Sequence, residues 1–150
     1  MSNTITRPQD PEVPPHGEGD VLEHLRNMTQ ELAAGRTSTA RKILHVMETN
    51  PAFTAVIAVN EDLKKEIRFL KEVYVLKELK NMKDHLAVGR TSHARDILHV
   101  IETDPALTAA IASNEELKKE IQSAKENIAK VEERIAKEEE RIAKYKSQRK

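Results

Sequence analysis

The chain of 150 residues contains no cysteine and no tryptophan, and it has only two phenylalanines and two tyrosines. Without cysteine it cannot form disulfides, use a thiol nucleophile or hold zinc through thiolates. A reducing compartment is therefore permitted, and the cytoplasm is the location that we expect.

Long apolar runs are also missing, although hydrophobic residues make up 38% of the chain and charged residues 33%. A membrane-spanning helix needs about 20 consecutive apolar residues. The composition is typical of a soluble, helix-rich protein, so we expect no membrane partner.

Catalytic motifs are a third absence. The sequence has no HExxH zinc motif, no glycine-rich phosphate loop and no nucleophile elbow. A metal is not expected, because zinc needs three or four converging ligands and Asp96 with His99 supplies two. We therefore expect a protein that is not an enzyme and that binds no cofactor.

The first 20 residues, MSNTITRPQDPEVPPHGEGD, contain four prolines and two glycines and offer almost nothing to bury. Such a segment cannot offset the entropy lost on ordering, so it is predicted to be a disordered leader. Its Ser, Thr, Asn and Pro content also resembles, loosely, the unstructured leaders of exported bacterial proteins. Export through this leader is the alternative to a cytoplasmic location.

The chain contains an internal duplication. Residues 22–67 align without a gap with residues 76–121, at a period of 54 residues, and 31 of the 46 aligned positions are identical. Each copy is expected to be one three-helix repeat, because apolar residues recur at helical steps of three and four.

Helix boundaries follow from the residues between these apolar stripes. Gly35 and Gly89 are predicted to end the first helix of each copy, since glycine reaches the left-handed conformation without penalty. Ser38 and Ser92 are predicted as the N-caps of the second helix.

A third, short helix is expected after Asn50-Pro51 and Asp104-Pro105, where a capping side chain precedes a proline at the first helical position. This helix is apolar nearly all round, which predicts an interior position. The next long helix is predicted to begin at Asn60 in the first copy. In the second copy, the prediction is Ser113, with Glu116 completing a capping box.

The second helix of each copy carries the candidate partner-binding residues. In the first copy, an apolar stripe of Ala40, Ile43, Leu44 and Met47 is expected to face inward, and polar residues are expected on the opposite side. These polar residues, with the preceding arginines, form two equivalent candidate surfaces: Arg36, Arg41, His45 and Glu48, then Arg90, Arg95, His99 and Glu102. The alternative is that the same residues recur only because the same unit must fold twice.

DNA binding is a second functional hypothesis. The helix pair around the sequence GRTS could form a helix-turn-helix, with Arg41 near the start of the recognition helix. Residues 141–150 add five positive charges and no acid. However, Lys42 becomes Asp96 in the second copy, and an aspartate there would repel phosphate.

The segment after the second copy shows a heptad pattern. Steps of four and three connect Leu117, Ile121, Ala124, Ile128, Val131, Ile135, Glu138, Ile142 and Tyr145. This spacing predicts a coiled-coil-like helix from about Asn114 to Gln148. It is expected either to fold back antiparallel onto the long helix from Asn60 to Val88 or to pair with a second copy as a homodimer.

The predicted architecture is all-α: two tandem three-helix repeats in one helical domain, followed by a long coiled-coil-like helix. The predicted segments are a leader (1–20), repeat 1 (21–67), a connecting helix with repeat 2 (68–121), and a heptad helix with a basic end (122–150). The predicted function is non-catalytic binding of another protein, as an adaptor, regulator or secreted effector. Nucleic acid is the less favoured partner.

Overall fold

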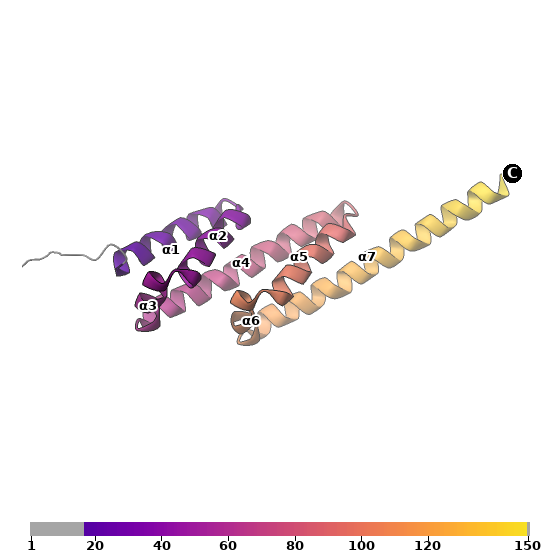
Figure 1. Cartoon of the computed structure of the whole chain (residues 1–150). Coiled ribbons are helices and arrows are strands. Elements are labelled where there is room, and N and C mark those ends of the chain that lie inside the picture. The colour runs from indigo at the N-terminus through magenta and orange to yellow at the C-terminus, as the bar shows by residue number, and fades with distance from the viewer. Residues whose placement is uncertain (1–16, 150) are drawn as a thin grey trace, which may run out of the picture. The chain divides into compact units, whose positions relative to one another are not determined.

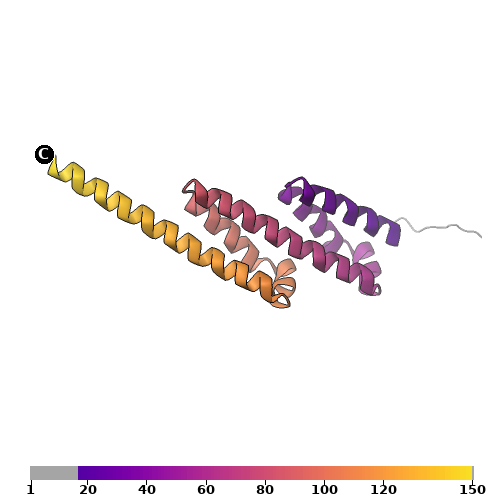
Figure 2. The same ribbon diagram turned by 180° about the vertical axis from the view of Figure 1, so that it is seen from behind.

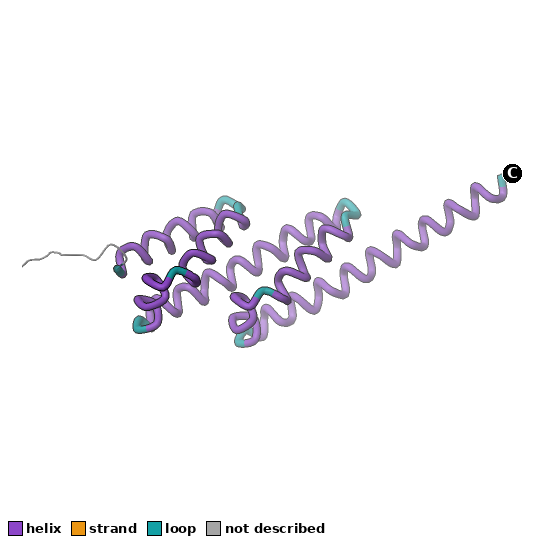
Figure 3. Tube along the Cα trace, viewed as in Figure 1, coloured by secondary structure: helices purple, strands orange, loops and turns teal. Residues whose placement is uncertain are grey.

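The computed structural model describes residues 17–149 and is all-helical over that range (Figures 1 and 3), which confirms the all-α part of the predicted fold class. Its helices are α1 (Glu18–Ala33), α2 (Thr37–Thr49), α3 (Pro51–Ala58), α4 (Glu61–Ala87), α5 (Thr91–Thr103), α6 (Pro105–Ala112) and α7 (Glu115–Gln148). Most of the predicted leader, residues 1–16, lies outside the described residues. α1 begins at Glu18, within the segment predicted as leader, and the acidic side chains of Glu18 and Asp20 suit the positive end of its dipole.

The backbone groups into two compact units, and the division falls inside α4, between Tyr74 and Val75. Unit 1 holds α1, α2, α3 and the first half of α4. Unit 2 holds the second half of α4 with α5, α6 and α7.

Unit 1 is built around a helical hairpin. α1 and α2 pack side by side, and α3 contacts both of them. Each helix turns its apolar stripe inward, as the three-and-four spacing predicts. The buried residues of this unit are Val21, Leu25, Met28 and Leu32 of α1, Ala40, Leu44 and Met47 of α2, Phe53 of α3, and Leu63, Ile67, Leu70 and Tyr74 of α4.

Gly35 and Gly89 end the preceding helices as predicted, with φ of 81° and 78°. In each turn the glycine N–H donates to the carbonyl three residues before it (3.0 Å in both), and the following arginine N–H donates to the carbonyl five residues before it (2.8 and 2.9 Å). This pair of hydrogen bonds is the Schellman motif, which satisfies the last carbonyls of a helix.

The predicted serine caps at Ser38 and Ser92 are wrong. α2 and α5 begin at Thr37 and Thr91, one residue before these serines. Their N-cap residues are Arg36 and Arg90, which make no side-chain capping hydrogen bond. The Schellman turn fixes the chain up to the arginine, so the next residue already enters the helix and no extended position is left for a serine.

The caps of the short helices are confirmed. Asn50 and Asp104 each accept a hydrogen bond from the N–H two residues later, at 3.0 Å. The predicted interior position of the short helix is only partly correct. α3 buries Phe53, whereas Val59, the residue that follows the end of α3, is 85% exposed. A helix of eight residues at the edge of a unit is covered on one side only, so its other apolar residues face solvent.

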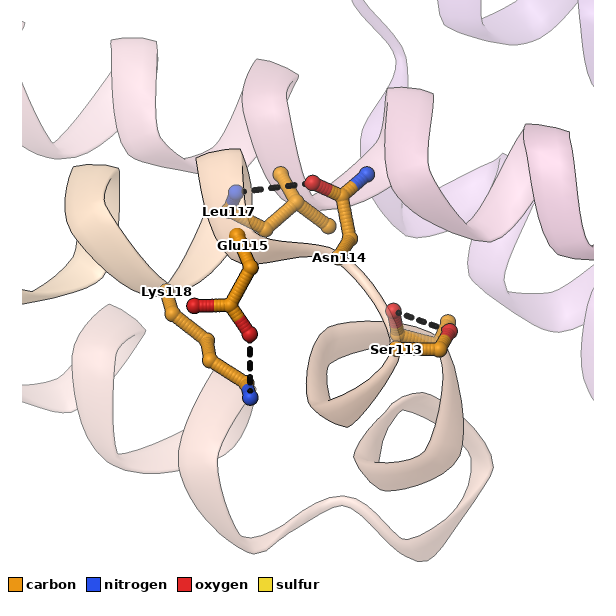
Figure 4. Close-up of polar contacts among 6 residues, drawn as sticks. Ser113, Asn114, Glu115, Leu117 and Lys118 are labelled. Atoms are coloured by element: carbon orange, nitrogen blue, oxygen red, sulfur yellow. Dashed lines mark hydrogen bonds and ion pairs between the residues drawn. The ribbon is translucent and has the colours of Figure 1, made fainter.

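Unit 2 begins its last helix with Asn114, whose side-chain oxygen accepts the N–H of Leu117 at 3.0 Å (Figure 4). The predicted cap at Ser113 is wrong, because its hydroxyl instead donates to the carbonyl of Ala110 at 3.2 Å. Asn60 accepts the N–H of Leu63 at 3.1 Å and so caps α4 as predicted.

α7 has 34 residues, or about 50 Å at 1.5 Å per residue, and it begins one residue after the predicted start at Asn114. Its inner half packs on α5 and α6, and Figure 2 shows it running antiparallel to α5. The heptad seam is buried from Leu117 to Ile128 and half-buried at Val131 and Ile135, and every residue from 136 to 149 is exposed. The inner half of the seam is therefore part of the core of unit 2, and the outer half extends beyond it.

Candidate functional site

Four of the eight predicted partner-binding residues form side-chain ion pairs inside their own unit: Arg36, Glu48, Arg95 and Glu102. Arg36 donates from Nε and Nη2 to the two carboxylate oxygens of Glu31, at 2.6 and 3.1 Å. The hydrogen bond lowers the pKa of the Glu31 carboxyl and raises the pKa of the Arg36 guanidinium. In the second copy the residue five positions before Arg90 is His85 instead of a glutamate, and the His85 ring stacks on His93 at a centroid distance of 5.1 Å.

Glu48 and Glu102 form the same tertiary ion pair in the two units. Glu48 lies 2.5 Å from the Nζ of Lys71 on α4, and Glu102 lies 2.5 Å from the Nζ of Lys125 on α7. Both glutamates stand beside the buried stripe of their helix, close to the long helix that follows. They therefore connect the second helix of a unit to its last helix.

Arg95 forms a bidentate ion pair with Glu132 of α7, in which its Nε lies 2.5 Å from one carboxylate oxygen and its Nη2 contacts the other. This hydrogen bonding raises the pKa of Arg95 and lowers the pKa of Glu132. Arg41 holds the corresponding position on α2 and is half-buried. The polar flank of α5 is thus occupied by contacts with α7.

The side chains of His45 and His99 are exposed on α2 and α5. Their backbone carbonyls accept hydrogen bonds from the hydroxyls of Thr49 and Thr103, at 2.7 Å in both cases. No group of three or more His, Asp or Glu side chains within residues 17–149 is arranged to hold a metal ion.

The opposite flank of each helix carries an apolar ridge, which we define as Ile43 with Val46 on α2 and Ile97 with Val100 on α5. Ile43 and its counterpart Ile97 were predicted to face inward, but both are only half-buried. The valines are 40% and 47% exposed. Residues three apart are neighbours on a helix, so each pair forms one continuous apolar surface.

The ridge was missed in the sequence because Val46 and Val100 lie outside the stripe of buried residues. On a helical wheel Val46 stands about 130° from the centre of the stripe formed by Ala40, Leu44 and Met47, at 100° per residue. A valine so far from the buried face was a signal available from the sequence alone.

A shallow apolar groove lies in unit 2 between α6 and α7. Its volume is about 340 Å³. It is lined by Ile111, Ala112, Thr108, Ile121 and Gln122, with Glu102, Lys118 and Lys125 at its charged rim. The rim lysines are already paired, Lys118 with Glu115 at 2.8 Å and Lys125 with Glu102. The groove offers apolar contact and presents no group placed for chemistry on a substrate.

Comparisons of the chain with protein-family models, curated proteins and solved structures gave no match. In the described part of the chain, no helix has both the length and the apolar character needed to cross a membrane.

Proposed function

We propose that this protein is a non-catalytic interaction module, made of two tandem three-helix repeats with a 54-residue period, that binds another protein through its duplicated apolar ridge. The observation that carries the proposal is the exposure of Val46 and Val100, at equivalent positions and to nearly the same extent. Apolar residues that stay in contact with solvent gain free energy when a partner covers them.

The chemistry around the ridge suits a protein partner. Lys42 and Thr49 lie four residues before and three residues after Val46, and Asp96 and Thr103 hold the same positions around Val100, so they supply polar groups at the border of the apolar surface. Such a centre of apolar contacts with a polar rim is the usual composition of protein interfaces. The predicted residues Arg36, Glu48, Arg95 and Glu102 would then support the surface by fixing the helices that carry it.

DNA binding is less well supported as an alternative. The Glu132 carboxylate already holds the guanidinium of Arg95, and Glu31 holds that of Arg36. Phosphate would have to displace these carboxylates before either arginine could contribute to affinity.

The test is affinity capture with the full-length chain, with and without nuclease, read by mass spectrometry. A protein captured by the wild type after nuclease treatment should be lost with V46E/V100E, and the melting temperature should remain that of the wild type. The matched control is K65E/K119E, which adds acids at equivalent exposed positions of α4 and α7, on the side of each helix opposite its buried stripe, and should retain the partner. Loss of the partner in both variants, or recovery of nucleic acid instead of protein, would contradict the proposal.

A further inference from the structure

The outer part of α7 carries a stripe that nothing in unit 2 covers. Glu138, Ile142, Tyr145 and Arg149 follow one another at steps of four, three and four, which places them on one face of the helix. Ile142 is 47% exposed and Tyr145 is 60% exposed. The stripe therefore has two large apolar side chains in the middle, an acid at its N-terminal end and a base at its C-terminal end.

We propose that this stripe pairs antiparallel with the same stripe of a second copy of the chain. In the register that places Ile142 opposite Tyr145 of the other copy, and Tyr145 opposite its Ile142, Glu138 falls opposite Arg149 at both ends. The charges beside the seam are complementary as well, because Glu139 of one copy then faces Lys146 of the other. Two apolar layers are flanked by four pairs of opposite charge.

Other arrangements of two copies are less favourable. A parallel pair in register would place Glu138 on the seam opposite itself and Arg141 beside Lys146, so like charges would meet. Moving the antiparallel pair by one heptad would place Glu138 against Ile142, and Glu139 against itself. Burying a carboxylate against an apolar side chain is costly, which selects the first register.

The proposed overlap also fits the exposed length of the helix. It uses residues 138–149, and all side chains from 136 to 149 are exposed within the single chain. The two folded bodies would lie at opposite ends of the overlap, so neither has to rearrange. In the single chain Glu138 pairs with Arg141 (Nη2–Oε1 2.5 Å), and the guanidinium of Arg149 lies 5.6 Å from the Tyr145 ring. Both are exposed contacts within one helix, and both would be exchanged for the contacts between the copies.

So short an overlap should give a weak dimer, because its interface is smaller than the roughly 1,200 Å² of a stable complex. We expect sedimentation equilibrium to show a reversible monomer–dimer equilibrium. This surface is independent of the apolar ridge, so the ridge variant V46E/V100E should dimerise like the wild type.

The register can be tested by disulfide trapping, because the chain has no cysteine of its own. Equal amounts of I142C and Y145C are mixed and oxidised under mild conditions. The proposed register predicts mainly the mixed disulfide between the two variants, whereas a parallel pair would give I142C–I142C and Y145C–Y145C. A mixture of A143C and K144C, whose positions face away from the seam, measures trapping by random collision.

The charge pattern provides a second measurement. R149E places two acids opposite each other at both ends of the overlap and should raise the dimer dissociation constant about tenfold. The double variant E138R/R149E restores opposite charges and should return the constant to near the wild-type value. K144E makes the same change of charge off the seam and should have little effect. Preferred homodisulfides, trapping no better than the A143C and K144C mixture, or equal effects of R149E and K144E would overturn the proposal.

Discussion

At the scale of single residues, Gly35 and Gly89 determine how each helical hairpin turns. Both have positive φ, a conformation in which other residues are strained. A Cβ atom added at Gly35 would meet nothing within 4 Å, and one added at Gly89 would meet only the Cδ1 of Ile135, at 4.0 Å. The need for glycine is therefore conformational and not a matter of space.

We expect G35A and G89A each to lower the free energy of unfolding by about 1 kcal/mol, the cost of placing a residue with a Cβ in the left-handed region. Urea denaturation followed by circular dichroism measures it. G19A is the matched control: Gly19 lies in α1 with open space around it, so alanine should leave stability unchanged or raise it slightly. Unchanged stability in both test variants would mean that these turns do not require positive φ.

Residue-scale signals in the sequence predicted some features and missed others. Asn50, Asp104 and Asn60 were identified as caps, because an Asn or Asp before a helical run has few other roles. Ser113 was preferred to Asn114 as a cap through its spacing to Glu116. Serine and asparagine are both favoured at N-caps, and only the end of α6 decides which of the two residues is free to cap α7.

At the scale of helices, the ion pairs between α5 and α7 show what the sequence leaves open. The periodic apolar stripes predicted every helix to within a few residues, because burial of one face decides a helix. The polar flank was interpreted as a binding surface, whereas Arg95 and Glu102 contact α7. A charged residue beside a buried stripe can serve either role, and only the position of the next helix distinguishes them.

The Arg95–Glu132 pair should make the stability of unit 2 depend on pH. Hydrogen bonding to Arg95 lowers the pKa of Glu132, so its contribution is complete above the ordinary carboxyl pKa of about 4.3 and is lost as the pH falls through the lowered value. We expect E132Q to melt below the wild type at pH 7, and the difference to disappear on acidification.

The neighbouring residue provides the control for this measurement. Glu133 is exposed and lies 3.9 Å from Lys137 of its own helix, a pair of little value to stability. E133Q should therefore melt close to the wild type at every pH. A melting difference for E132Q that stayed the same from pH 7 to pH 2.5 would show that Glu132 acts through packing and not through its charge.

At the scale of the whole molecule, the two long helices explain where the pattern of units stops. α4 buries one apolar stripe in unit 1 and a second stripe in unit 2, the second consisting of Val75, Leu79, Met82 and Leu86. The residues 54 positions later in α7 are Ala129, Glu133, Ala136 and Glu140, and all four are exposed. Two alanines and two glutamates in place of four large buried side chains leave α7 unable to form the start of another unit.

The sequence predicted this organisation as far as its duplication extends. The alignment covers residues up to Ile121, and both units have similar turns, caps and ion pairs. It did not show that unit 2 begins inside α4, because a continuous helix carries no capping signal at the point where its buried face changes. Only a change in the angular position of the apolar residues, from Leu70 and Tyr74 to Val75 and Leu79, marks this point.

A chain that continues from Ile128 directly into a further copy of residues 75–150 tests whether the 54-residue period is a structural repeat. Val75 then follows Ile128 as it follows Tyr74 in the natural chain, so both stripes keep their register. We expect a helical protein whose urea m-value is about one and a half times the original, since a third unit adds its buried surface. The control joins Ile128 to residue 77, which rotates the second stripe by about 200° and should add helix without adding to the m-value. Equal m-values for the two chains would mean that each unit depends on features that the period does not supply.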